Sequence, residues 1–237
     1  MVTYYAKRAV KILQEEGITE LFRRLGYELT YSSLTKYKYI SWKLEYEELH
    51  PKGNEIINVC PKKLDYSIGR KHLPTCSPTF GILDGDWDKK KSHWRNTRFE
   101  GLRERYVEGK DWDETYYYRH EMERLEQGHT VADNIQSIKE FKSYLKTIDE
   151  LYADIKNNGY DPNSVIVVSI GREGEWMVHQ GNHRRTISRI VGIDSVPVRI
   201  KYRHKQWQEL RDQIYHNGLS EEHIQLRNHP DLQNILD

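Results

Sequence analysis

The chain has 237 residues, and its 37 Lys and Arg residues almost balance its 36 Asp and Glu residues. A net charge of +1 gives no protein-wide basic field, which argues against strong non-specific DNA binding by the whole surface. The sequence has no apolar run long enough to span a membrane and no secretory signal, and Cys60 and Cys76 lack metal-ligand spacing, so we expect a cytoplasmic protein.

The first part of the chain predicts a helix followed by a strand. Tyr4–Leu25 combines apolar positions at helical spacing with five basic residues, which predicts a basic amphipathic helix. Such a helix packs on its own domain, lies on a membrane or docks a partner. In Tyr39–Tyr46 large side chains partly alternate with polar ones, which predicts a strand that pairs in a hairpin near Ile56–Val59.

A stretch rich in proline and glycine, from Pro51 to Pro78, predicts a domain boundary. We therefore expect an N-terminal helical and aromatic extension over 1–78 and a core domain over 79–237. The core domain should contain a helical insertion at about 97–158. Helical periodicity within it predicts three helices: Phe99–Val107, Glu114–Glu126 and Ile135–Lys156.

An acidic turn follows the apolar pair Ile82 and Leu83. Asp84, Asp86 and Asp88 lie within five residues, and such oxygen ligands suit Mg²⁺, with Asp86 and Asp88 as the expected metal ligands. One of the three carboxylates would instead serve as a general base, or the turn is purely structural. Four side chains that follow the acidic turn would reach a ligand phosphate or form a solvated loop: His93, Trp94, Arg95 and Arg98.

A second Asp-Trp-Asp motif ends at Asp113 and leads into a helical pattern. Asp113 is therefore expected to cap that helix.

The strongest pattern begins with the nearly continuously apolar run Ser164–Ile170, as expected of a central strand. A short turn leads to a second strand, Trp176–Gln180, and then to a helix that Gly192 ends. Alternation from Val196 to Tyr202 predicts another strand. If the strands on either side of the helix are parallel, the segment is a β-α-β unit.

The first turn of that helix is unusually basic. A helix N-terminus has unpaired N–H groups and partial positive charge, so His183, Arg184 and Arg185 after the expected N-cap Asn182 are unfavourable unless an anion binds. The alternative is a solvated basic turn with an arginine paired to a carboxylate. The expected phosphate or nucleotide site comprises Gln180, Gly181, Asn182, His183, Arg184 and Arg185.

This loop, its short helix and the strand beginning Val196-Pro197-Val198 resemble the central motif of the ParB/sulfiredoxin superfamily. The shared loop positions are Gly181, His183 and Arg184, and across the superfamily the loop holds nucleotide phosphates. Asn182 stands where sulfiredoxins have a cysteine, which excludes sulfinic acid reduction by that route, and the ParB glutamate is also absent. The resemblance implies an α+β fold, with a small mixed sheet surrounded by helices and, in this chain, an N-terminal helical extension.

Two functional classes follow. The resemblance to the free-serine kinases of this fold implies a kinase-like phosphotransferase or nucleotide hydrolase that uses ATP or ADP, Mg²⁺ and an unidentified acceptor. Its catalytic residues would come from the acidic turn and His183. The alternative is a ParB-like nucleic-acid-binding protein or nuclease, because residues 181–211 contain eight basic and two acidic residues. Four of these would contact nucleic acid: Arg199, Lys201, Arg203 and Lys205. A third possibility is that the domain serves only as an interaction module and that the Gly181 motif is vestigial.

Overall fold

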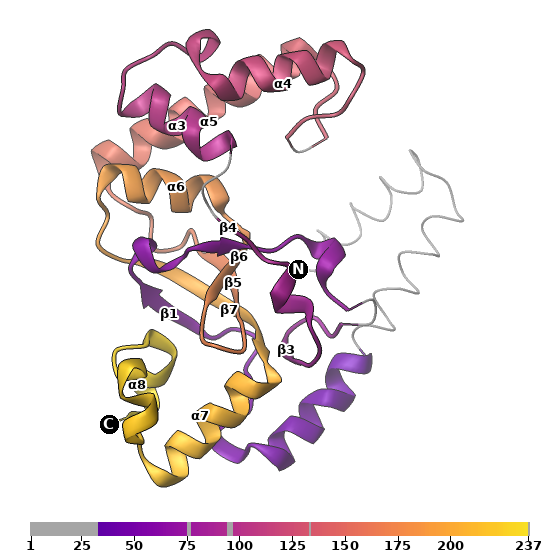
Figure 1. Cartoon of the computed structure of the whole chain (residues 1–237), viewed down its shortest axis with the longest axis vertical. Coiled ribbons are helices and arrows are strands. Elements are labelled where there is room, and N and C mark those ends of the chain that lie inside the picture. Colours follow the sequence, from indigo (N-terminus) through magenta and orange to yellow (C-terminus); the bar gives the residue numbers. More distant parts are fainter. Residues whose placement is uncertain (1–32, 75–76, 94–96, 133, 237) are drawn as a thin grey trace. The chain divides into compact units, whose positions relative to one another are not determined.

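A computed structural model describes residues 33–74, 77–93, 97–132 and 134–236 (Figure 1). The helix predicted for Tyr4–Leu25 lies outside these residues. The chain divides into two compact units, Met1–Gly53 with Pro74–Gly81 and Asn54–Leu73 with Ile82–Asp237. The sequence placed residues 54–73 in the N-terminal extension, whereas in the structure they belong to the larger unit, to whose sheet they contribute two strands.

In the smaller unit, residues 33–45 form a helix that is followed by the 3-10 helix η1 (Glu47–Leu49). The strand predicted for Tyr39–Tyr46 is therefore wrong. The buried side chains Thr35, Trp42 and Tyr46 are separated by seven and four residues, which is the helical period, and Trp42 packs near the ring of Phe80. The tyrosine content favoured a strand, but the burial pattern follows the helix.

The larger unit contains one open, mixed sheet, which confirms the α+β class. Its order is β1-β7-β5-β6-β2-β4, and β3 also pairs with β7. The strands are β1 (Ile56–Val59), β2 (Tyr66–Ser67), β3 (Gly81–Leu83), β4 (Ser92–His93), β5 (Ile166–Ile170), β6 (Trp176–Gln180) and β7 (Val196–His204). All five residues of β5 are buried, as predicted for the central strand.

The predicted β-α-β condition is not met by the strands that flank the helix α6 (Asn182–Val191). β5 pairs antiparallel with β6 and parallel with β7, so β6 and β7 run in opposite directions with β5 between them. The parallel pair is β5 and β7, and the hairpin strand β6 together with α6 forms their connection. Gly192 ends α6 in the left-handed conformation, as the sequence predicted.

The two faces of the sheet have different neighbours. On one face the alternate residues of β5, Ile166, Val168 and Ile170, form a core with Trp207 of α7 (Lys205–Asn217) and with Leu232. The opposite face packs Met177 and Tyr202 against Ile68, Leu83 and Trp87. The C-terminal segment is completed by the 3-10 helices η6 (Glu221–Leu226) and η7 (Pro230–Leu232) and by α8 (Gln233–Leu236).

A separate core around Phe141 holds together the helices α3, α4, α5 and α6, which Figure 1 shows grouped on one side of the sheet. Their bounds agree with the predicted insertion: α3 (Thr97–Tyr106), α4 (Tyr116–Glu126) and α5 (Ile138–Asn158). Asp113 does not cap α4, because it lies inside η5 (Trp112–Glu114) and the side chain of Thr115 caps the helix instead. The remaining 3-10 helices are η2 (Pro61–Lys63), η3 (Arg70–His72) and η4 (Trp87–Lys90).

A buried ionic network joins η7 to the end of β7. Asp231 accepts hydrogen bonds from Nε and Nη2 of Arg203 at 2.9 and 2.6 Å and from the indole of Trp207 at 2.9 Å. Its Oδ2 also lies 3.2 Å from Nε of Arg211. Glu55, next to β1, accepts two further bonds from Arg203. The network therefore links β1, β7, α7 and the C-terminal segment.

Replacing Gly174 with alanine should destabilise the turn between β5 and β6. Gly174 has φ +84°, and a Cβ there would lie 2.6 Å from Cζ3 of Trp207. We expect Gly174→Ala to lose about 1–3 kcal/mol more unfolding free energy in urea denaturation than Gly218→Ala. Gly218 is the matched control, because its φ is +78° and a Cβ there would meet no atom within 4 Å. Equal losses would show that the clash with Trp207 is relieved without cost.

Candidate functional site

The start of α6 is the part of the predicted site where backbone donors remain open. Gly181, with φ +95°, occupies the N-cap position, so the prediction that Asn182 is the N-cap is wrong. Asn182 is instead the first helical residue, and its Oδ1 accepts a hydrogen bond from Ser67 Oγ at 2.9 Å. The first intrahelical bond runs from Arg185 N to Gly181 O, so the N–H groups of Asn182, His183 and Arg184 have no helical acceptor. Within the described residues, no side chain accepts from them either.

The two arginines of the loop hold neighbouring backbone rather than pointing into an empty site. Arg184 donates from Nη1 to Ser164 Oγ at 2.8 Å and to the carbonyl of Val165 at 2.9 Å. Arg185 is fully buried and donates to the carbonyls of Leu64 and Tyr66. Burial, together with the nearby charge of Arg189, lowers the pKa of Arg185 to about 9. Both arginines therefore fix the segments that surround the loop, and Arg185 is inaccessible to a ligand.

His183 is neutral at pH 7. Its Nε2 lies 2.9 Å from the hydroxyl of Tyr144, and burial, with the charge of Arg98 nearby, lowers its pKa to about 3. The residue therefore contributes no positive charge to the first turn of α6. Of the side chains expected to reach a phosphate, Arg98 lies beside His183, His93 is exposed on β4, and Trp94 and Arg95 are outside the described residues.

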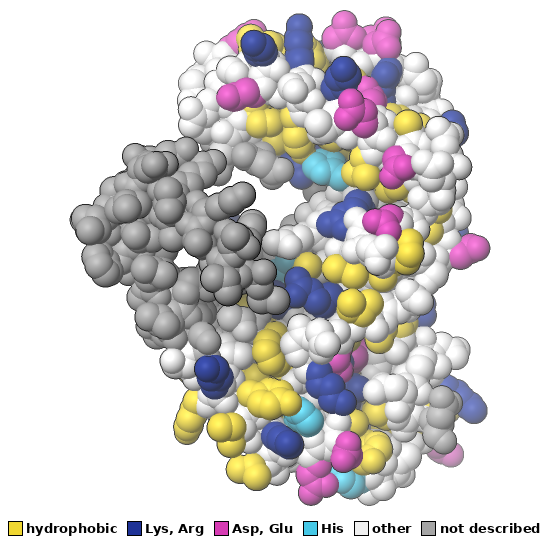
Figure 2. Space-filling view, turned by 180° about the vertical axis from the view of Figure 1, so that it is seen from behind, with side chains coloured by type: hydrophobic (Ala, Val, Ile, Leu, Met, Phe, Trp, Pro, Cys, Tyr) yellow, Lys and Arg dark blue, Asp and Glu magenta, His cyan; other side chains and the backbone are white. Residues whose placement is uncertain are grey.

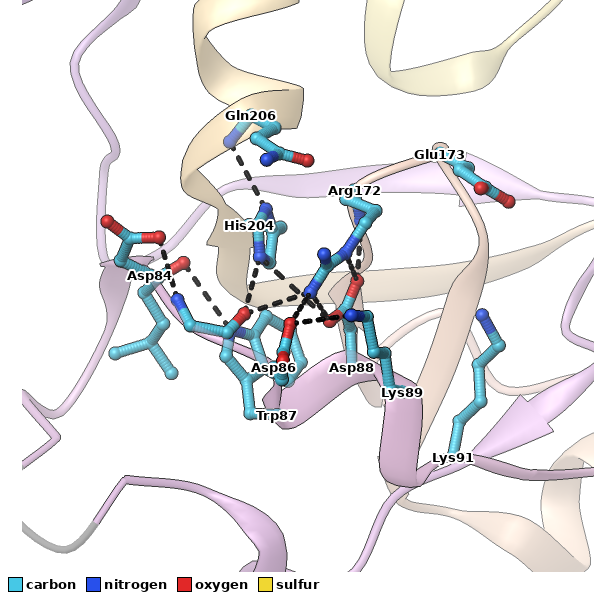
Figure 3. Close-up of polar contacts among 12 residues, drawn as sticks. Asp84, Asp86, Trp87, Asp88, Lys89, Lys91, Arg172, Glu173, His204 and Gln206 are labelled. Carbon is cyan, nitrogen blue, oxygen red and sulfur yellow. Dashed lines mark hydrogen bonds and ion pairs between the residues drawn. The ribbon is translucent and has the colours of Figure 1, made fainter.

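The acidic turn is tied to the hairpin turn between β5 and β6 (Figure 3). Arg172 donates to Asp88 from Nε at 2.8 Å and from Nη2 at 2.6 Å, and its Nη2 also bonds Asp86 at 2.9 Å. Burial alone would raise the pKa of Asp88, but the hydrogen bonds from Arg172 outweigh it and hold the pKa at about 2. Asp84 is exposed and bonds the N–H of Gly85. The carboxylates expected to hold Mg²⁺ thus face a guanidinium group, and no cluster of three metal-ligating residues exists among the described residues.

The acidic turn and the Gly181 loop do not form one site. Arg172, which holds the acidic turn, precedes β6, and Gly181 follows β6. Five residues of extended strand span about 17 Å. A single ligand phosphate therefore cannot contact the carboxylates of Asp86 or Asp88 and the backbone donors of α6 at the same time.

The pairing of β5 contains one register shift with β6 and one with β7, and each shift adds a polar residue to the neighbouring strand. Between β5 and β6 the register shifts by one residue, which leaves His179 as the extra residue. Between β5 and β7 it shifts between Val168 and Ser169, which leaves Lys201 as the extra residue. Bulges re-aim side chains and are common beside active sites. Here they flank the one polar residue of β5.

These residues form a small polar cluster at the centre of the sheet. Ser169 Oγ lies 2.6 Å from His179 Nε2, and burial lowers the pKa of His179 to about 4. The ammonium group of Lys201 lies 5.1 Å from the centroid of the Tyr202 ring. Burial and the nearby charges of Arg70 and Arg199 lower the pKa of Lys201. The neutral pair Ser169 and His179 therefore lies in a part of the sheet where Lys201 has two further cations, Arg70 and Arg199, nearby.

The basic residues predicted to meet nucleic acid divide into two pairs. Arg203 is buried against Asp231 and Glu55, and Lys205 lies within 4 Å of Asp84 and Glu209. In contrast, neither Arg199 nor Lys201 forms an ion pair with any residue that the structure describes. Arg199 and Gln180 are both register partners of Val167, so these two lie about 10 Å apart across the sheet, at the end where the Gly181 loop begins. The site can therefore accept an anion.

Sequence reasoning missed Ser169 and His179. Ser169 was visible as the single polar residue of an otherwise apolar strand, which is a signal for a buried polar contact. Nothing in the sequence indicates that His179 and Lys201 are extra residues in their strands, because a bulge is a property of pairing.

Comparisons with protein-family models, curated proteins and solved structures find no match to this chain.

Proposed function

We propose that the chain binds a phosphate-bearing ligand, most concretely a nucleotide, at the start of α6 and the adjoining surface of the sheet. The observation that carries this proposal is that three open N–H groups begin α6 directly after Gln180, while Arg199, about 10 Å from Gln180 across the sheet, and Lys201 have no carboxylate partner among the described residues. Backbone donors at a helix N-terminus bind phosphate oxygens, and cations nearby add charge-assisted contacts. The resemblance of the Gly181 loop to the ParB/sulfiredoxin superfamily supports the same ligand.

A kinase-like phosphotransferase or nucleotide hydrolase is the enzyme that such a site would serve, with ATP or ADP as the nucleotide. The acidic turn would not take part at the phosphates, since Arg172 holds Asp86 and Asp88 at the other end of β6. A Mg²⁺ ion would then be held mainly by the phosphates and by water, as is common for this ion.

Nucleic-acid binding is the second candidate, and the same two cations favour it because neither has an ion-pair partner in the described part of the chain. Phosphates of a polynucleotide are sequence-independent ligands for Arg199 and Lys201. Arg203 and Lys205 would add little, because both already have acidic partners. Free nucleotides and short nucleic acids therefore have to be compared in the same experiment.

The test is a thermal-shift panel of ATP, ADP, CTP and GTP with and without Mg²⁺, with single-stranded DNA and RNA oligonucleotides as a separate arm. A ligand present at about a hundred times its Kd stabilises the folded state by about 2.7 kcal/mol. We expect one nucleotide to stabilise the wild-type protein, and this stabilisation to be largely lost in Arg199→Gln/Lys201→Gln. The control is Lys89→Gln/Lys205→Gln, which removes the same charge near the acidic turn.

The result has three readings. Stabilisation by a nucleotide that the control retains and the first variant loses supports the proposal. Stabilisation only by oligonucleotides, with the same pattern, replaces it with nucleic-acid binding. Equal stabilisation of both variants, or none in the wild type, refutes a phosphate site at this position.

A further inference from the structure

The helix of residues 33–45 has two apolar faces, and only one of them is used by its own unit. Thr35 and Trp42 are buried, and Thr35 Oγ1 accepts a hydrogen bond from the backbone of Thr79 at 2.8 Å. Trp42 packs near Phe80, with ring centroids 6.5 Å apart. The face of the helix that contains Thr35 and Trp42 therefore packs within the smaller unit, and the side chains on the opposite face point outward.

The outward face is an apolar stripe. Its members, Tyr37, Ile40 and Leu44, are 74%, 62% and 79% exposed and are spaced by three and four residues, so they lie on one line along the helix. At 100° per residue, Lys36 and Lys43 flank this stripe on one side, whereas Lys38 lies closer to the buried Trp42 than to the stripe. In Figure 2 hydrophobic and basic side chains lie together over this helix, at lower left. None of the three lysines forms an ion pair within the described residues.

We propose that this stripe docks on an anionic lipid surface. A helix that lies in the membrane interface places large apolar side chains at the acyl boundary, while flanking lysines attract anionic headgroups. Tyrosine is suited to the same depth, because its ring is apolar and its hydroxyl stays hydrated. Docking would be peripheral, since no described helix is long and apolar enough to cross a bilayer.

The lysines favour lipid over a protein partner. Protein–protein interfaces are depleted of lysine and enriched in arginine, whereas anionic membranes attract lysine through the surface potential. The sequence of Tyr4–Leu25 also predicts a basic amphipathic helix, and this segment precedes the stripe in the chain. A second basic amphipathic element is what stable peripheral binding generally needs.

The test is co-sedimentation of the full chain with vesicles of equal parts phosphatidylglycerol and phosphatidylcholine, compared with pure phosphatidylcholine. We expect binding to the anionic vesicles only, weakened at about 1 M salt, where the Debye length is about 3 Å. Ile40→Ser/Leu44→Ser should bind at least about tenfold more weakly, because each lost apolar contact lowers interfacial affinity. Val107→Ser/Ile224→Ser, which changes two exposed aliphatic residues in the larger unit, should bind like the wild type.

Thermal unfolding and light scattering of the same proteins make the outcome decisive. The proposal predicts unchanged unfolding temperatures, because the two substituted side chains are exposed. A large fall in unfolding temperature for Ile40→Ser/Leu44→Ser, with vesicle binding intact, would show that another part of the chain covers the stripe. A wild-type dimer that this variant converts to monomer, without vesicle binding, would assign the stripe to a second copy. Either result, or absent binding to anionic vesicles, overturns lipid docking.

Discussion

Asp231→Asn should cost about 3–5 kcal/mol of unfolding free energy, the typical loss when one partner of a buried ion pair is removed. Asp231 is buried between Arg203 and Arg211, and it accepts a hydrogen bond from Trp207. Burial alone would raise its pKa, but the two arginines hold it at about 2, so the carboxylate is charged at neutral pH. An amide of the same shape leaves two buried cations with Glu55, at the edge of the network, as their one counter-charge among the described residues.

Urea denaturation at pH 7 measures this loss, and Asp194→Asn is the control because Asp194 is exposed. We expect the control to change stability by less than about 0.5 kcal/mol. If Asp231→Asn lost less than about 1 kcal/mol, the network would have to be hydrated or rearranged rather than dry.

The second large effect is a loss of stability as the pH falls below about 6.5, the pKa of an unfolded histidine. In the folded state burial lowers the pKa of His179 to about 4 and that of His183 to about 3. Between these values and 6.5 the unfolded chain binds protons that the folded chain does not, so the unfolding free energy decreases as the pH falls. Each histidine contributes up to about 1.4 kcal/mol per pH unit.

Denaturation midpoints measured from pH 7.5 to pH 4.5 would show this slope. His183→Gln should flatten it, because glutamine keeps a hydrogen-bonding group near Tyr144 but does not titrate. His216→Gln, at an exposed position of α7, should leave it unchanged. An identical slope in the wild type and His183→Gln would mean that His183 can be protonated without unfolding.

Local patterns predicted the elements that sequence neighbours determine. Gly192 ends α6 in the left-handed conformation, although α6 begins one residue earlier than predicted, after Gly181, and the apolar run of β5 is fully buried. The helix at 33–45 was misread because aromatic residues suit strands, while its period-3.6 burial depends on Phe80, which lies far along the chain.

Long-range pairing explains most of what the sequence concealed at the candidate site. From the sequence Asp88 is predicted to be a metal ligand, but in the structure it is bound by Arg172, which is 84 positions away in the chain. Arg185 is likewise predicted to be a phosphate ligand, but its guanidinium donates hydrogen bonds to the carbonyls of Leu64 and Tyr66. In both cases the residue type was informative about charge, but only the fold shows where the compensating group lies.

The position of β7 in the sheet has a consequence for synthesis of the chain. Both β1 and β3 pair with β7, and Ile56 of β1 is opposite Arg199, about 140 residues later. At a translation rate of about 5–20 residues per second, β1 waits roughly 7–30 s after its synthesis for its partner. A ribosome stalled before Val196 would therefore hold a nascent chain in which β1, β3 and one edge of β5 lack their partner, a natural substrate for chaperones.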